Sequence, residues 1–400
     1  MQRTLKRTTV VGTTVLLMLG LVACGDDDST SSSQASGSAG AASISTTDLT
    51  SDFSAMAKLK DLASQGKGKI AVLLPDTQSS ARYVSFDAPY LTKAFKAAGL
   101  SSDDFSVQNA QGSASTMQTQ ADAAITNGAS VLVVDALDSG SGAAIEQDAK
   151  SKGVATIDYD RLTLNGSSSY YVSFDNVVVG KSMGQGLVDC VNQWNVQKPQ
   201  VLEMDGDPTD NNATLFAQGY NSVLKPQFDS GDYVKVGEPA GTWDSQTALT
   251  NFEQQFTAHS NVNAVVTAND TLANSVISVL KTNQIPAKTI PTTGQDATLI
   301  GLQNILAGYQ CMSVYKPIYT EAQAAVAVAL YVRAGETPPS SLVNGTTNNE
   351  QTDVPSVLLK PVSVNADNMN DTVVKDKFVD PAELCAGSLA AACRSAGIGS

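Results

Sequence analysis

Short apolar runs alternate with helical stretches along most of the chain, and this alternation limits the possible folds more than any other feature. The first clear run is Lys69–Leu74 (KIAVLL), and Ala88–Ala98 follows it with apolar residues at helical spacing. Continuous apolar runs of this length are typical of parallel strands that are covered on both faces. Strands separated by helices form βαβ units and parallel sheets. The pattern predicts an α/β fold with two doubly wound parallel-sheet lobes and a cleft between them.

The expected elements fall into two successive sets of roughly five strands each. Strands are expected at 69–74, 105–108, 131–134, 155–157, 170–174, 200–204, 233–236, 264–267, 289–293 and 311–314. Helices are expected at 88–98, 115–127, 142–152, 178–190, 215–224, 245–259, 271–282, 301–307 and 318–333. The polar stretch Leu342–Asp353 and the apolar run Val354–Leu359 are interpreted as an extended crossing between the lobes.

The N-terminus has the features of an export signal. Three basic residues precede an apolar run from Val10 to Val22 that is too short for a comfortable membrane span. We therefore predict a signal peptide at 1–23. It ends in Leu-Val-Ala before Cys24, which resembles the lipobox of bacterial lipoproteins. That resemblance implies a lipidated Cys24 that anchors the protein to the outer face of the bacterial cell membrane. An ordinary signal peptide with an unrelated cysteine is the alternative.

Residues 24–67 are predicted to be a lipidated cysteine and a flexible linker, because the segment begins with a long run of small and polar residues. Loss of the three basic residues of the leader would change the formal charge of the chain from −14 to −17. A strongly acidic chain argues against nucleic acid as a partner.

Four cysteines remain after Cys24, and an even number outside the cytoplasm favours disulfides. Cys385 and Cys393 are close in the sequence and are expected to pair in a short tail at 382–400. Cys190 and Cys311 are then left either to pair or to remain as buried thiols.

Polar and aromatic residues follow the expected strands, and the carboxyl ends of strands in such sheets face a common cleft. These residues include Arg82, Tyr83, Arg161, Asp210, Asn212, Trp243, Asn269, Asp296 and Lys316. Arginine and carboxylate groups can bind neighbouring hydroxyls, and aromatic rings can cover the C–H face of a sugar. Each residue also has an ordinary interpretation, and Asp210 in particular could simply cap a helix. Together they favour a site for a neutral sugar.

Several segments resemble the D-xylose-binding proteins of ABC transporters, which belong to the ribose/galactose class of periplasmic binding proteins. The segments are IDYDR (157–161), YYVSFDNVVVG (170–180), GDPTDNNATLF (206–216), TANDTLA (267–273), TGQDA (293–297), MSVYKP (312–317) and DVPSVLLKPVSV (353–364). The resemblance implies sugar contacts at Arg82, Arg161, Asp210, Asn212, Trp243, Asn269, Asp296 and Lys316. Tyr83 is a departure, because relatives typically carry tryptophan beside that arginine.

The resemblance also implies a domain organisation. The N-terminal lobe would comprise 68–174 and 317–358, and the C-terminal lobe 175–316 and 359–381, with three crossovers at the hinge. Closure of the lobes on a ligand would change the surface that a membrane permease recognises.

The sequence therefore predicts a monomeric, lipid-anchored receptor that binds a monosaccharide, first of all D-xylose, and delivers it to an ABC permease. No catalytic residue, cofactor or metal is expected. A sugar sensor that presents its closed form to a membrane receptor is one alternative. A glycoside hydrolase that uses Asp210 and Asp296 is another, although neighbouring cations oppose the raised pKa that an acid catalyst needs.

Overall fold

The structure is a computed structural model that describes residues 43–399. The predicted signal peptide and the predicted lipidation site Cys24 lie outside the described residues. Within the part that is described, none of the helices combines the length and the apolar character needed to cross a membrane.

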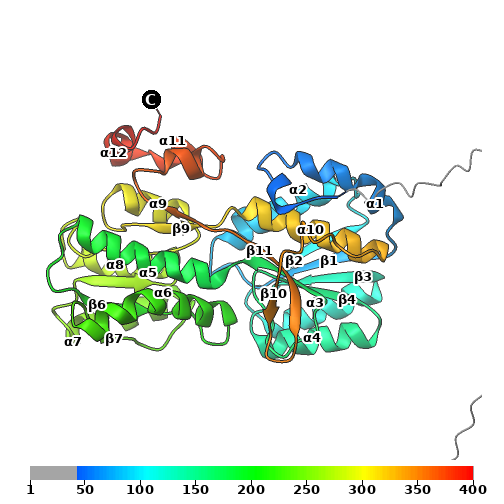
Figure 1. Ribbon diagram of the computed structural model, residues 1–400, viewed down its shortest axis with the longest axis horizontal. Helices are drawn as coiled ribbons and strands as arrows, with labels where there is room; N and C mark the ends of the chain where they lie inside the picture. Colours follow the sequence, from blue (N-terminus) through cyan, green and yellow to red (C-terminus); the bar gives the residue numbers. More distant parts are fainter. Residues whose placement is uncertain (1–42, 400) are drawn as a thin grey trace, which may run out of the picture. The chain divides into compact units, whose positions relative to one another are not determined.

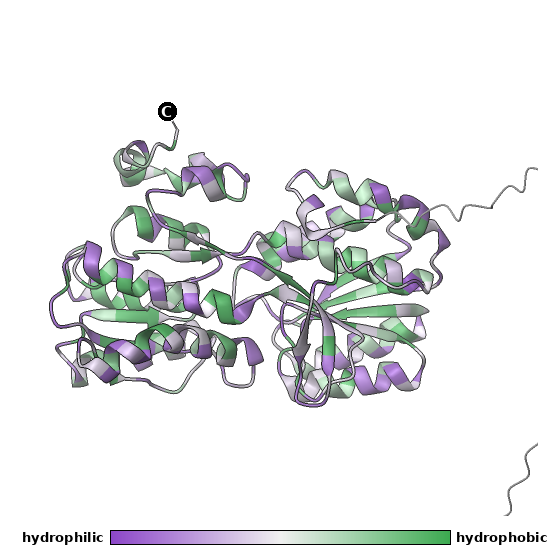
Figure 2. Ribbon diagram, in the orientation of Figure 1, coloured by the Kyte–Doolittle hydropathy of each residue, from purple (hydrophilic) through white to green (hydrophobic). Residues whose placement is uncertain are grey.

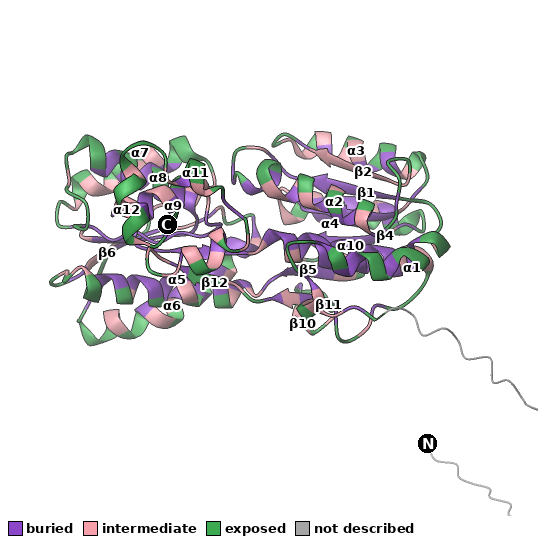
Figure 3. Cartoon of the chain, turned by 90° about the horizontal axis from the view of Figure 1, so that it is seen from above, coloured by how far each residue is buried: buried purple, intermediate pink, exposed green. Residues whose placement is uncertain are grey.

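The N-terminal lobe is built on a seven-stranded sheet with the strand order β10-β11-β5-β4-β3-β1-β2 (Figure 1). The strands are β1 (Lys69–Leu74), β2 (Phe105–Asn109), β3 (Ala129–Val134), β4 (Ala155–Tyr159), β5 (Tyr170–Phe174), β10 (Gly345–Asn348) and β11 (Asp353–Leu359). All neighbours are parallel except β10 and β11. The packed helices are α2 (Ala88–Ala97), α3 (Ala114–Thr126), α4 (Ser139–Ser151) and α10 (Ile318–Ala334). The central strands are buried between them, as their apolar runs predict (Figures 2 and 3).

The C-terminal lobe is built around β6 (Gln200–Met204), with β7 (Val234–Gly237) and β8 (Ala264–Thr267) parallel on its two sides. A second small sheet pairs β9 (Ser313–Tyr315) with β12 (Val362–Val364). The strand expected at 289–293 is reduced to isolated bridges that connect these two sheets, Thr292 to Val265 and Gln295 to Val314. The helices are α5 (Asn176–Gln193), α6 (Asn211–Ser230), α7 (Ser245–Ala258), α8 (Asp270–Thr282) and α9 (Leu299–Leu306). Two lobes with parallel sheets confirm the predicted fold class.

Residues 43–67 are folded, so the prediction of a flexible linker that extends to residue 67 is wrong for this part. The segment forms three short helical elements, η1 (Thr46–Asp48), η2 (Ser54–Leu59) and α1 (Lys60–Gln65). Its buried side chains include Ile44, Phe53, Met56 and Leu59, which belong to the same core as β1. Arg333 of α10 fastens the end of the segment by donating hydrogen bonds to the carbonyls of Ala63 (2.9 Å) and Gly68 (2.8 Å). A few well-placed apolar residues are thus sufficient to order a largely polar segment.

The segment 342–359 contains a hairpin, which corrects its interpretation as an extended crossing alone. β10 and β11 pair antiparallel, and β11 extends the main sheet by pairing in parallel with β5. The chain passes to the other lobe after Leu359, because Val362 already pairs with Tyr315.

Two disulfides join the four cysteines of the described chain. Cys190 is bonded to Cys311, which selects one of the alternatives that the sequence left open, and Cys385 is bonded to Cys393. After β12 the chain forms η4 (Asn370–Val374), and the tail begins with α11 (Pro381–Leu384) and continues with η5 (Gly387–Leu389) and α12 (Ala390–Ser395). Gln303 of α9 donates a hydrogen bond to the carbonyl of Glu383 at 3.0 Å, so the tail packs on the C-terminal lobe.

Candidate functional site

All nine residues predicted for the ligand site line one cavity between the two lobes. The lining residues are Ser79, Ser80, Arg82, Tyr83, Asp160, Arg161, Asp210, Asn212, Phe216, Trp243, Asn269, Gln295, Asp296 and Lys316. Most of them lie beyond the carboxyl end of a strand, or in the first turns of the helix that follows it, and Gln295 and Asp296 lie in the segment of isolated bridges. The free space between these side chains is ≈ 20 Å³, about enough for one water molecule. The cavity therefore has no room for a larger ligand in this conformation.

Arg82 is the centre of a buried ion network in the N-terminal lobe. It lies at the start of η3 (Tyr83–Asp87), a π-helical turn that leads into α2. Its Nε and Nη2 atoms donate to the two carboxylate oxygens of Asp87 at 2.9 and 2.8 Å. Nη1 donates to Asp160 at 2.7 Å, and Nη2 also donates to Glu321 of α10 at 2.5 Å. A guanidinium group has five N–H donors, so at most one remains for a ligand. The structure thus makes Arg82 an organiser of the site first of all.

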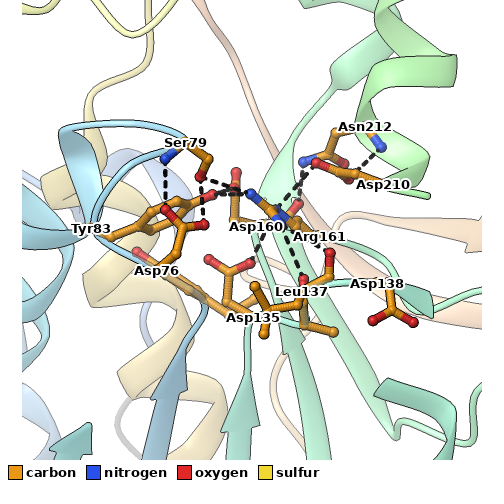
Figure 4. A network of polar contacts seen from close by, with 12 residues as sticks. Asp76, Ser79, Tyr83, Asp135, Leu137, Asp138, Asp160, Arg161, Asp210 and Asn212 are labelled. Carbon is orange, nitrogen blue, oxygen red and sulfur yellow. Dashed lines mark hydrogen bonds and ion pairs between the residues drawn. The ribbon is translucent and has the colours of Figure 1, made fainter. Parts of the chain in front are cut away.

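Tyr83 links this network to Arg161. Its hydroxyl donates to Asp160 Oδ2 and accepts from Arg161 Nη2, both at 3.1 Å (Figure 4). The guanidinium carbons of Arg82 and Arg161 lie 5.5 and 5.6 Å from the centre of its ring, within cation–π range. The position that departs from the family pattern is therefore occupied by a residue whose hydroxyl and ring both contact charged groups.

Asp160 connects the two lobes and was not among the predicted contacts. Its backbone carbonyl accepts hydrogen bonds from Tyr171 (2.9 Å) and from Asn212 of α6 (3.1 Å). Burial acts to raise the pKa of its carboxyl, but the charges of Arg82, Lys316 and Arg161 outweigh burial and hold that pKa well below its usual range. Asp160 has a φ of 57°, and Asp296 has a φ of 89°, values that are uncommon for residues with a side chain. The segment IDYDR, which begins within β4 and continues past its end, was the available signal for Asp160.

Asp210 serves both as a helix cap and as a member of the site. Oδ1 accepts from the backbone N–H of Asn212 at 2.9 Å and caps α6. Oδ2 accepts from Trp243 Nε1 at 3.1 Å and lies 3.2 Å from Arg161 Nε. Burial raises the pKa of Asp210, and Arg161 opposes that increase. Gly206 lies against the Trp243 ring, and a Cβ atom at this position would overlap the ring.

Lys316 and Asp296 form the other side of the cavity. Lys316 Nζ lies 3.4 Å from Asp296 Oδ1 and 3.5 Å from Asp160 Oδ1. Asn269 caps α8 through Oδ1, which accepts from the N–H of Leu272 at 2.9 Å, and its Nδ2 atom donates to the carbonyl of Ser79 at 3.2 Å. Asn212 Oδ1 accepts from Asn176 at 2.8 Å. The site therefore presents its carboxylates, amides and ammonium group in fixed orientations.

Buried carboxylates outnumber buried cations in and around the cavity. The carboxylates are Asp87, Asp135, Asp160, Asp210, Asp296 and Glu321, and the cations are Arg82, Arg161 and Lys316. Burial is the main cause that raises the pKa of Glu321 to about 8, and it also raises the pKa of Asp135 well above its usual range. Burial thus favours the neutral form of both carboxyls, which reduces the imbalance. An anionic ligand would add to the excess of negative charge, whereas a neutral ligand would not.

One other group of carboxylates in the described chain lies close enough together to hold a cation, formed by Glu203, Asp205 and Glu238. Lys235 Nζ already lies 2.8 Å from Glu203 and 2.5 Å from Glu238. Because the ammonium group supplies the positive charge, this cluster does not call for a metal ion.

Comparisons with known proteins agree with this fold. A family described as a periplasmic binding protein domain matches residues 70–337. The D-xylose-binding periplasmic protein of Escherichia coli (strain K12) is 38% identical over 280 residues, which cover 70% of this chain and 82% of the relative. The multiple sugar-binding periplasmic protein SbpA of Azospirillum brasilense is 33% identical over 336 residues, which cover 80% of this chain and 92% of that one.

Among solved structures, an ABC transporter solute binding protein from Clostridium phytofermentans with bound β-D-glucose superimposes with a TM-score of 0.71. It is 30% identical in sequence, and the match covers 79% of this chain and 99% of that structure. The similarity therefore extends over both lobes.

Proposed function

The chain belongs to the periplasmic binding protein family, and from this premise we propose that it captures a monosaccharide between its lobes and delivers it to the permease of an ABC importer. The observation that carries the proposal is that all nine predicted sugar contacts line one cavity. D-xylose is the first candidate, because the E. coli relative at 38% identity is named for that sugar.

The chemistry of the cavity suits a neutral, polyhydroxylated ligand. Asp210, Asp296 and Asn212 can accept hydrogen bonds from hydroxyls, and Lys316 can donate to ring or hydroxyl oxygens. Trp243 is partly exposed and can cover an apolar sugar face, with its orientation set by the bond to Asp210. Entry of a sugar would replace the contacts that these residues now make with one another.

The choice between a pentose and a hexose depends on a small free-energy difference. One CH₂OH group is worth about 1–3 kcal/mol in a pocket of this kind. The relatives include a D-xylose-binding protein and a structure with bound glucose. We therefore expect D-xylose to bind most tightly and D-glucose to compete at higher concentration.

The family consists of binding proteins, and the chain is not an enzyme. The hydrolase alternative is therefore excluded. The geometry agrees with this, because both oxygens of Asp210 already face N–H groups.

We further propose that Cys24 is lipidated and anchors the protein outside the cell membrane. We also propose that the protein binds its ligand as a monomer, since both walls of the cavity come from the same chain. Incorporation of labelled palmitate by the full chain, lost in Cys24→Ser, tests the anchor. Labelling that persists in the variant would refute it.

The binding proposal is tested by calorimetric titration of a chain that starts at Ser43, because the segment that follows belongs to the core. We expect micromolar or tighter binding of D-xylose. In Asp210→Asn we expect affinity to fall by about 10- to 100-fold, because asparagine keeps the helix cap but loses the charged acceptor. Absence of binding to any monosaccharide would refute the proposal.

A matched control is Asp244→Asn. Asp244 caps α7 by accepting from the N–H of Thr247 at 2.7 Å, but it is exposed and lies outside the cavity lining. Its replacement should leave the sugar affinity within about twofold. Delivery is tested by uptake of labelled xylose in cells that lack the protein, and unchanged uptake would favour the sensor alternative.

A further inference from the structure

The turn Asp76–Ser80 holds itself together by its own hydrogen bonds. Asp76 Oδ1 accepts from the backbone N–H groups of Gln78 (2.7 Å) and Ser79 (2.6 Å), and Oδ2 accepts from Ser79 Oγ at 2.7 Å (Figure 4). Asn109 of β2 donates to the carbonyl of Asp76 at 2.7 Å. These bonds, which organise the turn, all come from residues of the N-terminal lobe.

Two adjacent residues of this turn bond to the C-terminal lobe. Ser80 Oγ donates to Asp296 Oδ2 at 2.7 Å, and the carbonyl of Ser79 accepts from Asn269 Nδ2 at 3.2 Å. The residues involved are all buried. Ser80 Oγ also accepts from the backbone N–H of Arg82 at 3.3 Å, which orients the hydroxyl toward Asp296.

The partners in the C-terminal lobe are themselves held in place. Asn269 is fixed by its cap on α8, and Asp296 is held by its backbone N–H, which donates to the carbonyl of Val314 at 2.9 Å. Two rigid pieces therefore meet at these bonds. When the lobes separate, both bonds must break and their groups must be hydrated.

We propose that Ser80 is a positioning residue that acts through Asp296, and that the Asp76–Ser80 turn is a latch that sets the lifetime of the closed, sugar-bound form. The inference rests on the proposed function of the same site. A bound sugar cannot leave a closed cavity until the lobes separate, so a bond made only on closure retards dissociation. Association begins from the open form, in which the bond is absent, so its rate is unaffected.

The test is stopped-flow fluorescence on Ser80→Ala, in the chain from Ser43 onward, with D-xylose and D-glucose as the probes. We expect the dissociation rate to rise about tenfold, as for loss of a hydrogen bond to a charged group, and the association rate to change less than twofold. The increase should be similar for both sugars, because the bond that is lost joins Ser80 to Asp296 of the protein. Ser85→Ala is the matched control, since Ser85 is exposed on η3 and is absent from the cavity lining.

An unchanged dissociation rate, or a fall in association as large as the rise in dissociation, would overturn the latch. An effect confined to one sugar would also overturn it, because Ser80 would then be a direct sugar contact. If the unaltered chain binds no monosaccharide, the proposed function fails. Small-angle scattering of the sugar-free chain then tests separately whether the turn holds the lobes closed. Ser80→Ala must then be more open than the unaltered chain, and equal scattering would refute the latch.

Discussion

Arg82 is at once a predicted sugar contact and the cation of a buried network, and its replacement by methionine separates these roles. The change would leave the carboxylates of Asp87, Asp160 and Glu321 without the group that now lies within 2.5–2.8 Å of each. Removal of one partner from a buried ion pair costs about 3–5 kcal/mol. Lys316, at 3.5 Å from Asp160, partly balances the charge of only one of these three carboxylates. We therefore expect Arg82→Met to lower the free energy of unfolding by at least about 3 kcal/mol.

The loss of folding stability in Arg82→Met should depend on pH. Arg82 lowers the folded-state pKa of Glu321, so without Arg82 that pKa rises further from its value of about 8. A carboxyl whose folded-state pKa exceeds its unfolded value of about 4.3 favours folding at acidic pH, and that stability is lost as pH rises through the folded-state pKa. The unaltered chain stops losing this stability near pH 8 while the variant continues to lose it, so the destabilisation should be greater at about pH 9 than at pH 5.5.

The assay is urea unfolding followed by far-UV circular dichroism at both pH values. Lys225→Met is the control, because its ion pair with Asp229 is exposed and should contribute less than about 1 kcal/mol. Adding Asp87→Asn and Glu321→Gln to Arg82→Met should restore at least half of the loss, since fewer unpaired charges remain buried. If Arg82→Met abolishes sugar binding with an unchanged unfolding midpoint, Arg82 is chiefly a ligand contact and the reasoning is wrong.

Three further outcomes are expected. Burial is the main reason why the pKa of Asp205 is raised to about 7. The folded protein therefore loses stability as the pH rises from about 4 to about 7, and Asp205→Asn should reduce this loss by up to about 4 kcal/mol. The measurement is unfolding across that pH range. An identical pH profile would contradict this. Replacing both Cys190 and Cys311 by serine opens a loop with a sequence separation of 121 and should cost about 5 kcal/mol in urea unfolding. A cost below about 1 kcal/mol would show that the loop is already constrained in the unfolded chain. Gly206→Ala should push the Trp243 ring out of place and weaken sugar binding about tenfold by calorimetry, whereas unchanged affinity would show that the ring can move freely.

The fold could be predicted wherever one strand or helix carries its own signal. Buried parallel strands are continuous apolar runs, so β1 and β3 were located from local sequence alone. The segment 43–67 carries only isolated apolar residues, which become ordered by contact with α10 and the core. The hairpin at 345–359 lacks a strong turn signal and depends on pairing with β5, which is distant in the sequence. Such long-range packing leaves no local periodicity to detect.

The site could be predicted as a set of residues but not as a network. Residues after strands meet at one edge of a sheet, which explains why all nine predicted residues line the cavity. Glu321 escaped prediction because it lies inside a helix, 239 positions from Arg82. Asp135 was not predicted, because a single carboxylate after a strand does not indicate that it will lie 3.6 Å from Arg161 Nε.

The sequence by itself determined the α/β architecture, the polar edge of each sheet and the residue types available to a ligand, because these follow from local patterns and from the direction of the strands. Only the tertiary structure decided which hydrogen-bond donors already have partners within the protein. How many N–H groups of Arg82 are already bonded, whether Asp210 lines the cavity as well as capping a helix, and whether Ser80 reaches Asp296 all depend on distances between remote segments. A hydrogen bond acts over about 3 Å, and only the packed chain sets distances on that scale.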